Sequence, residues 1–548
     1  MSASSKKKLR KEQEAVKMTE KQLAAQKEAK KTKLYTAAFV AVMAVILAIA
    51  IVVGATQFIS NSGIREKNTT AVTIGEHKLS NAELNYFYVD TINNFYSQNG
   101  SYASLFGLDT TLPLNEQIFD ETTGQTWADY FLESAESTAK AVYAMVDAAN
   151  AAGHTLTEDE LANVDSMMST FSMYAGLYGY SDSETYLKAM YGKGATEEGM
   201  RTYLENSVLA DSYNSAHIAS LTYEDADLRA AEAENYDLYS SYTYNYYYLS
   251  ASRFLEGGTT DEDGNTTYSD EETAASIAAA EEAAKSLVAS EIASVADLDA
   301  AIAALPITAE NTSVKSTGFT DYAYASIDED LAAWLADDAR QEGDVGYVAN
   351  NNTSTDENGN AVTEITGYYV AYFISENDNA FPMKNVRHIL ANFEGGTTDD
   401  SGNTTYSDEE KAAAKAVAEE ILNEWKAGEA TEDSFAALAT ERSDDTGSVA
   451  AGGLYEDIYP GQMVTAFEDW CYDDARKAGD TGIVETEYGY HVMYFVGNSD
   501  TTFRDYQIRN ELSNADHSEW YNAILDAIVV TEGNTEYLSK DIVLGGSY

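Results

Sequence analysis

The residues of this chain with the clearest capacity for chemistry are two of its six histidines, His388 and His491. Each lies in a short apolar run that predicts a β-strand. Asp445 and a glycine-rich segment lie between them in the sequence. If the two strands are neighbours in one sheet, the imidazoles and the carboxylate could form a polar cluster. The alternative is that both histidines are core residues whose ring nitrogens are merely satisfied by hydrogen bonds.

These residues belong to the second of two internal repeats. Two similar segments, each containing Gly-Gly-Thr-Thr and Asn-Thr-Thr-Tyr-Ser-Asp-Glu-Glu, end at Glu272 and Glu410, an offset of 138 residues. Further on, Trp334 and Trp470 are each followed by a matching Asp-Asp-Ala-Arg run. The chain therefore contains two copies of one domain of about 120 to 140 residues.

The pattern of the second copy predicts a small sheet flanked by helices. Ser407 and Glu410 have the spacing of a capping box, so a helix is expected to begin there. Other expected helices are 431–440 and 464–476, and the expected strands are 386–393, 482–485 and 490–496. This order gives an α+β domain that positions His388 on the first strand and His491 on the last.

An ordered set of motifs in the second copy resembles the parvulin-type peptidyl-prolyl isomerases, over residues 385–498. The motifs are Val386-Arg387-His388-Ile389-Leu390, Ser443-Asp444-Asp445 with Gly447-Ser448, Gly452-Gly453, Gly461-Gln462-Met463 with Phe467-Glu468, and Tyr488-Gly489-Tyr490-His491-Val492. The resemblance implies a site in which the two strand histidines face each other under an acidic residue. The implied catalytic residues are His388, Asp445, His491 and Tyr488, and the implied proline-binding residues are Met463, Phe467 and Tyr455.

Two of these residues depart from the family pattern. Tyr455 stands near the position of a pocket leucine, and Tyr488 replaces a Ser or Thr found in some relatives. The reaction that the resemblance implies needs no nucleophile and no cofactor. An X-Pro bond isomerises over a barrier of about 18 to 20 kcal/mol, and an apolar pocket that twists the amide out of plane lowers it. Covalent attack by Asp445 is a weaker alternative.

The first copy, residues 241–380, lacks these polar residues. Tyr369 stands where His491 stands, and no histidine occurs near Leu249. We expect this copy to be a degenerate, inactive parvulin-like domain that either binds polypeptide or acts as a spacer. Its acidic segment 259–270 has part of a calcium-loop pattern, but a solvated acidic turn is the favoured interpretation because key ligand positions are missing.

The charge is distributed very unevenly along the chain. The net charge is −57, yet residues 1–33 are basic and the rest is strongly acidic. Nucleic acid is therefore an unsuitable partner for the large part, because phosphate binding needs a concentrated basic surface. The only cysteine, Cys471, excludes an intrachain disulfide and is expected to be a small buried hydrophobe.

An uncharged apolar run of twenty residues, 34–53, follows the basic segment. As a helix it would rise about 30 Å, the thickness of a bilayer core. We expect a single-pass signal anchor over residues 34–55, a cytoplasmic N-terminus and an extracellular bulk. A cleaved signal peptide is the alternative.

The predicted architecture is multidomain. A helical domain, residues 72–240, is expected to be all-α and chaperone-like. The two α+β parvulin-like domains follow at 241–380 and 381–498, and a C-terminal helix within 499–548 packs on the α domain. This layout resembles the extracytoplasmic foldases of Gram-positive bacteria, which implies unfolded exported polypeptides with X-Pro bonds as partners. The rival hypothesis is a non-catalytic surface chaperone that uses the parvulin fold as a grip.

Overall fold

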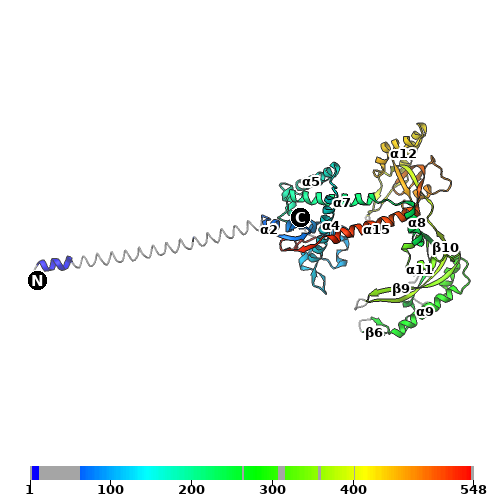
Figure 1. The fold of residues 1–548 in the computed structure, drawn as a ribbon, viewed down its shortest axis with the longest axis horizontal. Helices are drawn as coiled ribbons and strands as arrows, with labels where there is room; N and C mark the ends of the chain where they lie inside the picture. The colour runs from blue at the N-terminus through cyan, green and yellow to red at the C-terminus, as the bar shows by residue number, and fades with distance from the viewer. Residues whose placement is uncertain are drawn as a thin grey trace. The chain divides into compact units, whose positions relative to one another are not determined.

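The computed structural model describes residues 3–11, 43, 62–261, 265–305, 315–355, 360–399 and 402–544. Apart from Met43, the predicted membrane anchor lies outside these residues. The chain divides into two compact units: unit 1 is Met1–Leu221 with Ala515–Tyr548, and unit 2 is Thr222–Asn514 (Figure 1).

Unit 1 is built mainly from helices that begin at strong capping residues. Ser80, Thr126 and Thr157 each form a capping box with an acidic residue three positions later. The helices are α2 (Ile64–Asn68), α3 (Asn81–Asn99), α4 (Trp127–Ala152), α5 (Glu158–Leu177), α6 (Ser183–Tyr191) and α7 (Glu197–Ser220). Side chains of α3 and α4, including Phe87, Ile92, Trp127 and Phe131, form the largest core.

Unit 1 also contains a sheet, so the all-α prediction for this region is wrong. The strand order is β17-β1-β2, with β1 at Thr70–Ile74, β2 at His77–Ser80 and β17 at Val530–Glu532. A second small sheet pairs β3 (Ile118–Asp120) with β4 (Gln125–Thr126). These strands have two to five residues, too few for a period-two pattern to stand out among helices.

The predicted C-terminal helix is α15 (Phe503–Ala527), and its later part belongs to unit 1. There His517 contacts Asn214 of α7 through a hydrogen bond of 2.7 Å, and Trp520 stacks on His217 with ring centroids 3.7 Å apart. The expectation that this helix packs on the helical domain is confirmed for that part.

Unit 2 begins with α8 (Asp225–Glu234) and continues into the two repeats, each with its own four-stranded sheet. In the first repeat the order is β8 (Thr317–Ala323), β5 (Ser241–Ser250), β10 (Ala361–Asn377) and β9 (Val345–Thr355). Helices α9 (Asp270–Val288) and α10 (Val295–Ala303) cover one face, and α11 (Glu329–Leu335) covers the other. Figure 1 shows α9 running along the sheet that contains β9 and β10.

The second repeat has the same topology. Its sheet runs β14 (Leu454–Ile458), β11 (Pro382–Asn392), β16 (Gly489–Thr502) and β15 (Thr481–Glu485). Helices α12 (Asp408–Ala427) and α13 (Glu432–Arg442) cover one face, while α14 (Thr465–Cys471) covers the other. The α+β prediction is confirmed, although β14 was not predicted and α14 ends five residues earlier than expected.

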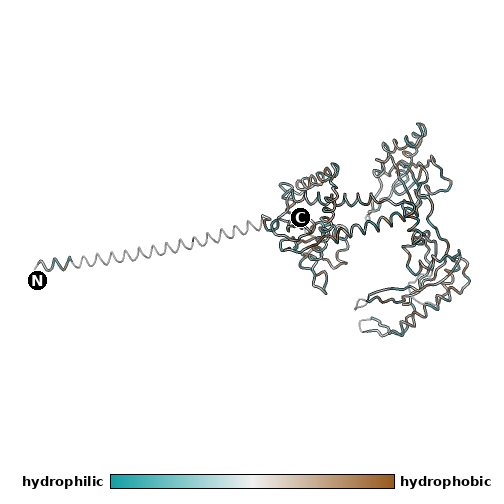
Figure 2. The backbone as a smooth tube through the Cα atoms, viewed as in Figure 1, coloured by the Kyte–Doolittle hydropathy of each residue, from teal (hydrophilic) through white to brown (hydrophobic). Residues whose placement is uncertain are grey.

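The described helices are amphipathic rather than uniformly apolar. Figure 2 shows hydrophilic and hydrophobic residues interspersed along the elements of both units. None of the helices in the described part of the chain combines the length and the hydropathy needed to cross a bilayer.

Candidate functional site

The site of the second repeat is organised by the two central strands of its sheet. In the antiparallel register of β11 and β16, Leu390 pairs with His491 and His388 pairs with Met493. The two histidines are thus diagonal neighbours on one face of the sheet. Their Nδ1 atoms lie 3.0 Å apart, and both side chains are buried.

Asp445 reaches His388 from the loop that follows α13. This loop is pinned to β11, because the backbone N–H of Asp444 donates to the carbonyl of Leu390 at 3.0 Å. The hydroxyl of Ser443 accepts hydrogen bonds from the N–H groups of Leu390 and Asp445, at 3.1 and 3.2 Å. The Oδ2 atom of Asp445 then lies 2.8 Å from Nε2 of His388.

The Asp445 carboxylate is the end point of several hydrogen bonds. Its Oδ2 atom also accepts from the hydroxyls of Ser448 and Tyr455, at 2.5 and 3.0 Å, and its Oδ1 atom accepts from the N–H of Gly447 at 3.1 Å. Burial works in the opposite direction, but these donors together lower the pKa of Asp445 to about 2. The carboxylate is therefore ionised throughout the physiological range.

The partners fix the tautomers of both imidazoles. His388 donates Nε2–H to the carboxylate, which leaves its Nδ1 as an acceptor for Nδ1–H of His491. The Nε2 atom of His491 then accepts from the hydroxyl of Thr486 at 2.9 Å. A chain of hydrogen bonds thus runs in one direction from Thr486 through both histidines to Asp445.

Both histidines are held neutral. Burial lowers the pKa of His388, although the hydrogen bond to Asp445 acts against this shift. Burial, reinforced by the neighbouring His388, lowers the pKa of His491 to about 4. The network at neutral pH therefore carries one charge, that of the carboxylate.

Apolar and aromatic side chains adjoin the network. The ring of Phe467 from α14 meets His388 and His491 edge-on, with centroids 5.5 and 5.3 Å away, and Tyr455 stacks on His388 at 5.0 Å. Met463 packs partly buried against the same cluster. These three side chains place an apolar surface beside a buried polar network.

Gly453 allows β14 to approach β11 at the site. Its φ is +72°, and a Cβ atom there would lie 2.2 Å from the carbonyl oxygen of His388. The N–H of His388 in turn donates to the Gly453 carbonyl at 2.8 Å. The second glycine of the Gly452-Gly453 pair is therefore required for the position of Tyr455 on β14.

The structure brings together six of the seven residues predicted for the site. The exception is Tyr488, whose side chain is 59% exposed. Both ring nitrogens of His491 are already bonded to His388 and Thr486, so neither is available to the Tyr488 hydroxyl. The family pattern predicts a hydroxyl three positions before His491, at Tyr488, whereas the hydroxyl that meets Nε2 is that of Thr486, five positions before it.

Two other residues of the network could have been found in the sequence. Ser443 and Ser448 both lie in the motifs that resemble the parvulin family, Ser443-Asp444-Asp445 and Gly447-Ser448. As expected, Cys471 is a buried small side chain, 1% exposed, and burial raises the pKa of its thiol to about 12.

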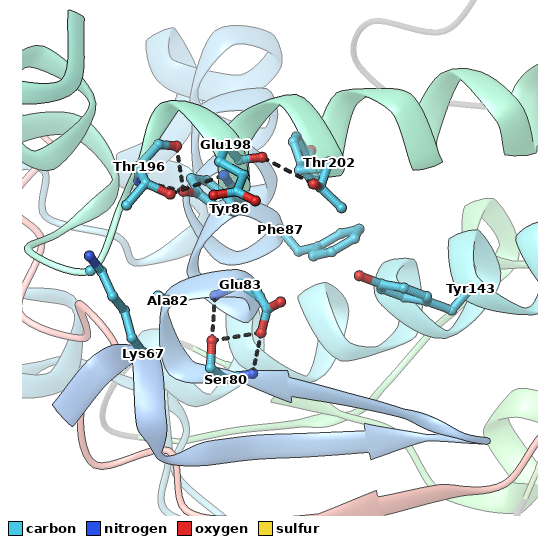
Figure 3. A pocket seen from close by; sticks show the side chains of 13 residues that line it. Lys67, Ser80, Ala82, Glu83, Tyr86, Phe87, Tyr143, Thr196, Glu198 and Thr202 are labelled. Atoms are coloured by element: carbon cyan, nitrogen blue, oxygen red, sulfur yellow. Dashed lines mark hydrogen bonds between the residues drawn. The ribbon is translucent and has the colours of Figure 1, made fainter. Parts of the chain in front are cut away.

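Unit 1 contains a separate concave site between α3, α4 and α7 (Figure 3). The rings of Phe87 and Tyr143 line it, with centroids 6.3 Å apart. Glu83, held by Ser80, also lines the site, as do Glu198 and Lys67. This site combines an aromatic surface with side chains of both charges.

Comparison with known proteins identifies the second repeat. Residues 388–497 match the family model described as Rotamase, PPIC-type PPIASE domain. Foldase protein PrsA 1 of Listeria innocua is 40% identical over 82 residues, which are 15% of this chain and 26% of that protein. Chaperone SurA of Chromohalobacter salexigens is 43% identical over 112 residues, covering 20% of this chain and 21% of that protein.

The chain thus spans about a quarter of the length of the curated relatives it matches. Among solved structures, PrsA from Bacillus subtilis aligns with 84% of this chain and 90% of its own, at 13% identity and a TM-score of 0.25. The sequence match and the geometry of the site concern the same residues. The chain therefore carries, at residues 388–497, a parvulin-type peptidyl-prolyl isomerase domain that resembles the domain of PrsA foldases.

Proposed function

We propose that this protein is an extracytoplasmic foldase that isomerises X-Pro bonds of unfolded exported polypeptides at the second repeat. The observation that carries the proposal is the hydrogen-bonded network of His388, His491 and Asp445 beside the apolar side chains of Phe467 and Met463. A neutral histidine pair next to apolar walls suits a reaction in which no covalent bond is made or broken.

In this mechanism the pocket takes the proline ring and the preceding amide out of water. Resonance keeps the amide planar and is strongest in water, so desolvation and twisting act together on the barrier. Because its Oδ2 atom already accepts three hydrogen bonds, Asp445 is poorly suited to nucleophilic attack.

The preferred substrate in this proposal is unphosphorylated. The Arg387 side chain, next to His388, is engaged with Glu432 at 3.0 Å and with the carbonyls of Ala451 and Gly452. It is therefore already committed within the domain, whereas recognition of a phosphate requires a cluster of available cationic donors.

The proposed location rests on the sequence. The basic segment 1–33, the apolar run 34–53 and the acidic remainder favour a single-pass membrane protein with its bulk outside the cell. Foldases of the PrsA type, to which the second repeat is similar, supply the analogy for exported clients.

The test is the rate of cis-trans isomerisation of a short unphosphorylated X-Pro peptide by the full chain, beside His388→Ala and Asp445→Ala. Acceleration that falls in both variants is the expected result. If the folded chain gives no acceleration, isomerase activity is refuted.

The second candidate is a holding chaperone that binds clients without catalysis, and the aromatic site of unit 1 favours it (Figure 3). Its test is suppression of the aggregation of an unfolded client by the His388→Ala chain. Full suppression without isomerisation by the wild-type chain would favour this candidate over the foldase.

A further inference from the structure

The first repeat has a counterpart of the isomerase site, and the strand register identifies it. In the first repeat Tyr369 pairs with Tyr248, and Ala371 pairs with Tyr246. The corresponding pairs in the second repeat are His491 with Leu390 and Met493 with His388. Tyr246 therefore occupies the place of His388, and Tyr369 that of His491. Their ring centroids are 5.6 Å apart, compared with 5.2 Å for the two histidines.

Independent landmarks support this alignment of the repeats. Arg340 lies over Trp334 at 3.8 Å, and Arg476 lies over Trp470 at 4.0 Å. In both copies one aspartate, Asp321 or Asp457, adopts a positive φ, 46° and 54°, at the edge strand of the sheet.

The pocket walls stay apolar in the first repeat. Phe319 pairs with Tyr244 on β5 as Tyr455 pairs with Val386 on β11, so Phe319 takes the place of Tyr455. Counting back from the equivalent tryptophans, Leu331 takes the place of Phe467 and Ile327 that of Met463. All three belong to one cluster that the half-buried Tyr246 and Tyr369 also join.

The polar network is replaced by aromatic rings in contact with one another. We define the tyrosine cluster as Tyr246, Tyr248, Phe319, Tyr322 and Tyr369, all of which are half-buried. Phe319 contacts Tyr322 and Tyr246 with centroids 4.4 and 5.9 Å away, and Tyr248 contacts Tyr369 at 5.1 Å. The Tyr369 hydroxyl accepts a hydrogen bond from Asn350 at 3.0 Å, which fixes the ring in place.

The tyrosine cluster has aromatic rings that can hold a polypeptide, but it lacks the histidine pair to which catalysis is assigned in the second repeat. No imidazole stands at either histidine position. Rigid aromatic faces bind proline rings and extended proline-containing segments, because such segments lose little entropy on binding. The same faces attract cationic side chains.

The charge of the first repeat selects between possible ligands. Residues 241–380 contain 26 Asp or Glu and four Lys or Arg. Next to the cluster, Asp328 interacts with Tyr369, and Asp330 accepts hydrogen bonds from the backbone and side chain of Asn351. An acidic surround of this kind favours a basic segment over an acidic one.

We propose that the tyrosine cluster is a second polypeptide-binding site, which holds a proline-containing segment bearing lysine or arginine without isomerising it. The ligand class rests on the proposed function of the second repeat, but the site itself does not share any residue with that repeat.

The experiment uses the full chain and a photo-crosslinking peptide with one Ala-Pro bond, a benzophenone beside it and flanking lysines. Two matched peptides replace the proline by alanine or the lysines by glutamates. Mass spectrometry of the products is expected to find crosslinks near Tyr246 and Phe319 as well as near Phe467, with the lysine peptide bound most tightly. Crosslinks confined to the second repeat would overturn the inference.

Two pairs of variants test the role of the rings. The double variant Tyr246→Leu with Tyr369→Leu is expected to weaken binding at the first repeat about tenfold or more, while isomerisation changes by less than about twofold. Tyr246→Phe with Tyr369→Phe keeps the rings and should keep the binding, which controls for misfolding of the leucine pair. If neither double variant loses binding at the first repeat, the inference is also overturned.

The two proposals fail in different ways. An active isomerase with crosslinks only near Phe467 retains the proposed function and removes the second site. An inactive chain whose crosslinks lie near Tyr246 and Phe319 removes the isomerase and retains the second site. Phe467→Ala adds a further check, because it should abolish isomerisation and leave the crosslinks in the first repeat unchanged.

Discussion

The Nδ1 atoms of His388 and His491 lie 3.0 Å apart and share one proton. Protonating His388 would bring a second N–H into this contact. Protonating His491 would place an N–H on its Nε2 atom, so that this atom could no longer accept the hydrogen bond from Thr486. The pair is therefore stable in its neutral form, and its pH dependence can be predicted.

The first prediction concerns stability at acid pH. The pKa of His491 is lowered to about 4 in the folded chain, whereas an unfolded histidine titrates near about 6.5. The unfolded chain thus binds the extra proton first, and stability falls as the pH drops from about 6.5 to about 4, by about 3 kcal/mol. The pKa of Asp445 is lowered to about 2, so protonation of this carboxylate causes a further loss of stability as the pH falls below about 4.

Hydrogen exchange of β11 and β16, corrected for the intrinsic pH dependence of exchange, measures this loss. The His491→Gln chain serves as the control, since it lacks the titrating group and should show a shallower dependence above pH 4. Equal slopes in the two chains would contradict the assignment of the neutral pair.

The second prediction concerns the charge on Asp445. In Asp445→Asn the side chain keeps its shape but loses the charge that orients His388, Ser448 and Tyr455. Hydrogen bonds to charged groups contribute about 1.5 to 3 kcal/mol, so kcat/KM for an X-Pro peptide should fall about 10- to 100-fold. Nitrogen NMR of the His388 ring should report an altered tautomer, and an unchanged kcat/KM would remove the carboxylate from the mechanism.

The third prediction separates two hydroxyls close to His491. Thr486→Val removes the donor to Nε2 with little change of shape, and should cost about 1 kcal/mol of stability and several-fold in kcat/KM. Tyr488→Phe is the matched control, because that hydroxyl lies on an exposed side chain. If Tyr488→Phe lowers kcat/KM more than Thr486→Val does, the Tyr488 hydroxyl belongs to the site.

The fourth prediction concerns two glycines that both have a positive φ. The φ angles of Gly453 and Gly461 are +72° and +87°. A Cβ atom added at Gly453 would lie against the carbonyl of His388, whereas one added at Gly461 would meet no atom within 4 Å. Gly461→Ala should cost about 1 to 2 kcal/mol from left-handed strain alone. Gly453→Ala should cost clearly more and lower isomerase activity, as followed by urea unfolding and kcat/KM. Equal costs would show that β14 moves freely away from β11.

The isomerase site was largely predictable because its residues lie in short motifs whose order is preserved along the chain. His388, His491, Asp445, Met463 and Phe467 come together as the resemblance implied. Thr486 was not found, since the length of the turn between β15 and β16 decides which hydroxyl meets Nε2 of His491, and that length has no signature in residue types.

The fold of unit 1 was harder to predict than that of the repeats. The helices follow from capping boxes such as Ser80 with Glu83, which are local. The pairing of Val72 with Glu532 joins strands that are distant in sequence, and neither strand has an alternating pattern long enough to be recognised. The equivalence of Tyr246 with His388 likewise needed the strand register, because the two sequences around them share little.

The pairing of β1 with β17 has a consequence for biosynthesis. Asn81, at the start of α3, bonds the carbonyl of Asn534, 453 positions further along the chain. Each repeat of unit 2 has its own sheet and core and can fold as soon as it leaves the ribosome. The sheet of unit 1 must wait for the final residues, so an interrupted translation product would contain folded repeats attached to an incomplete N-terminal unit.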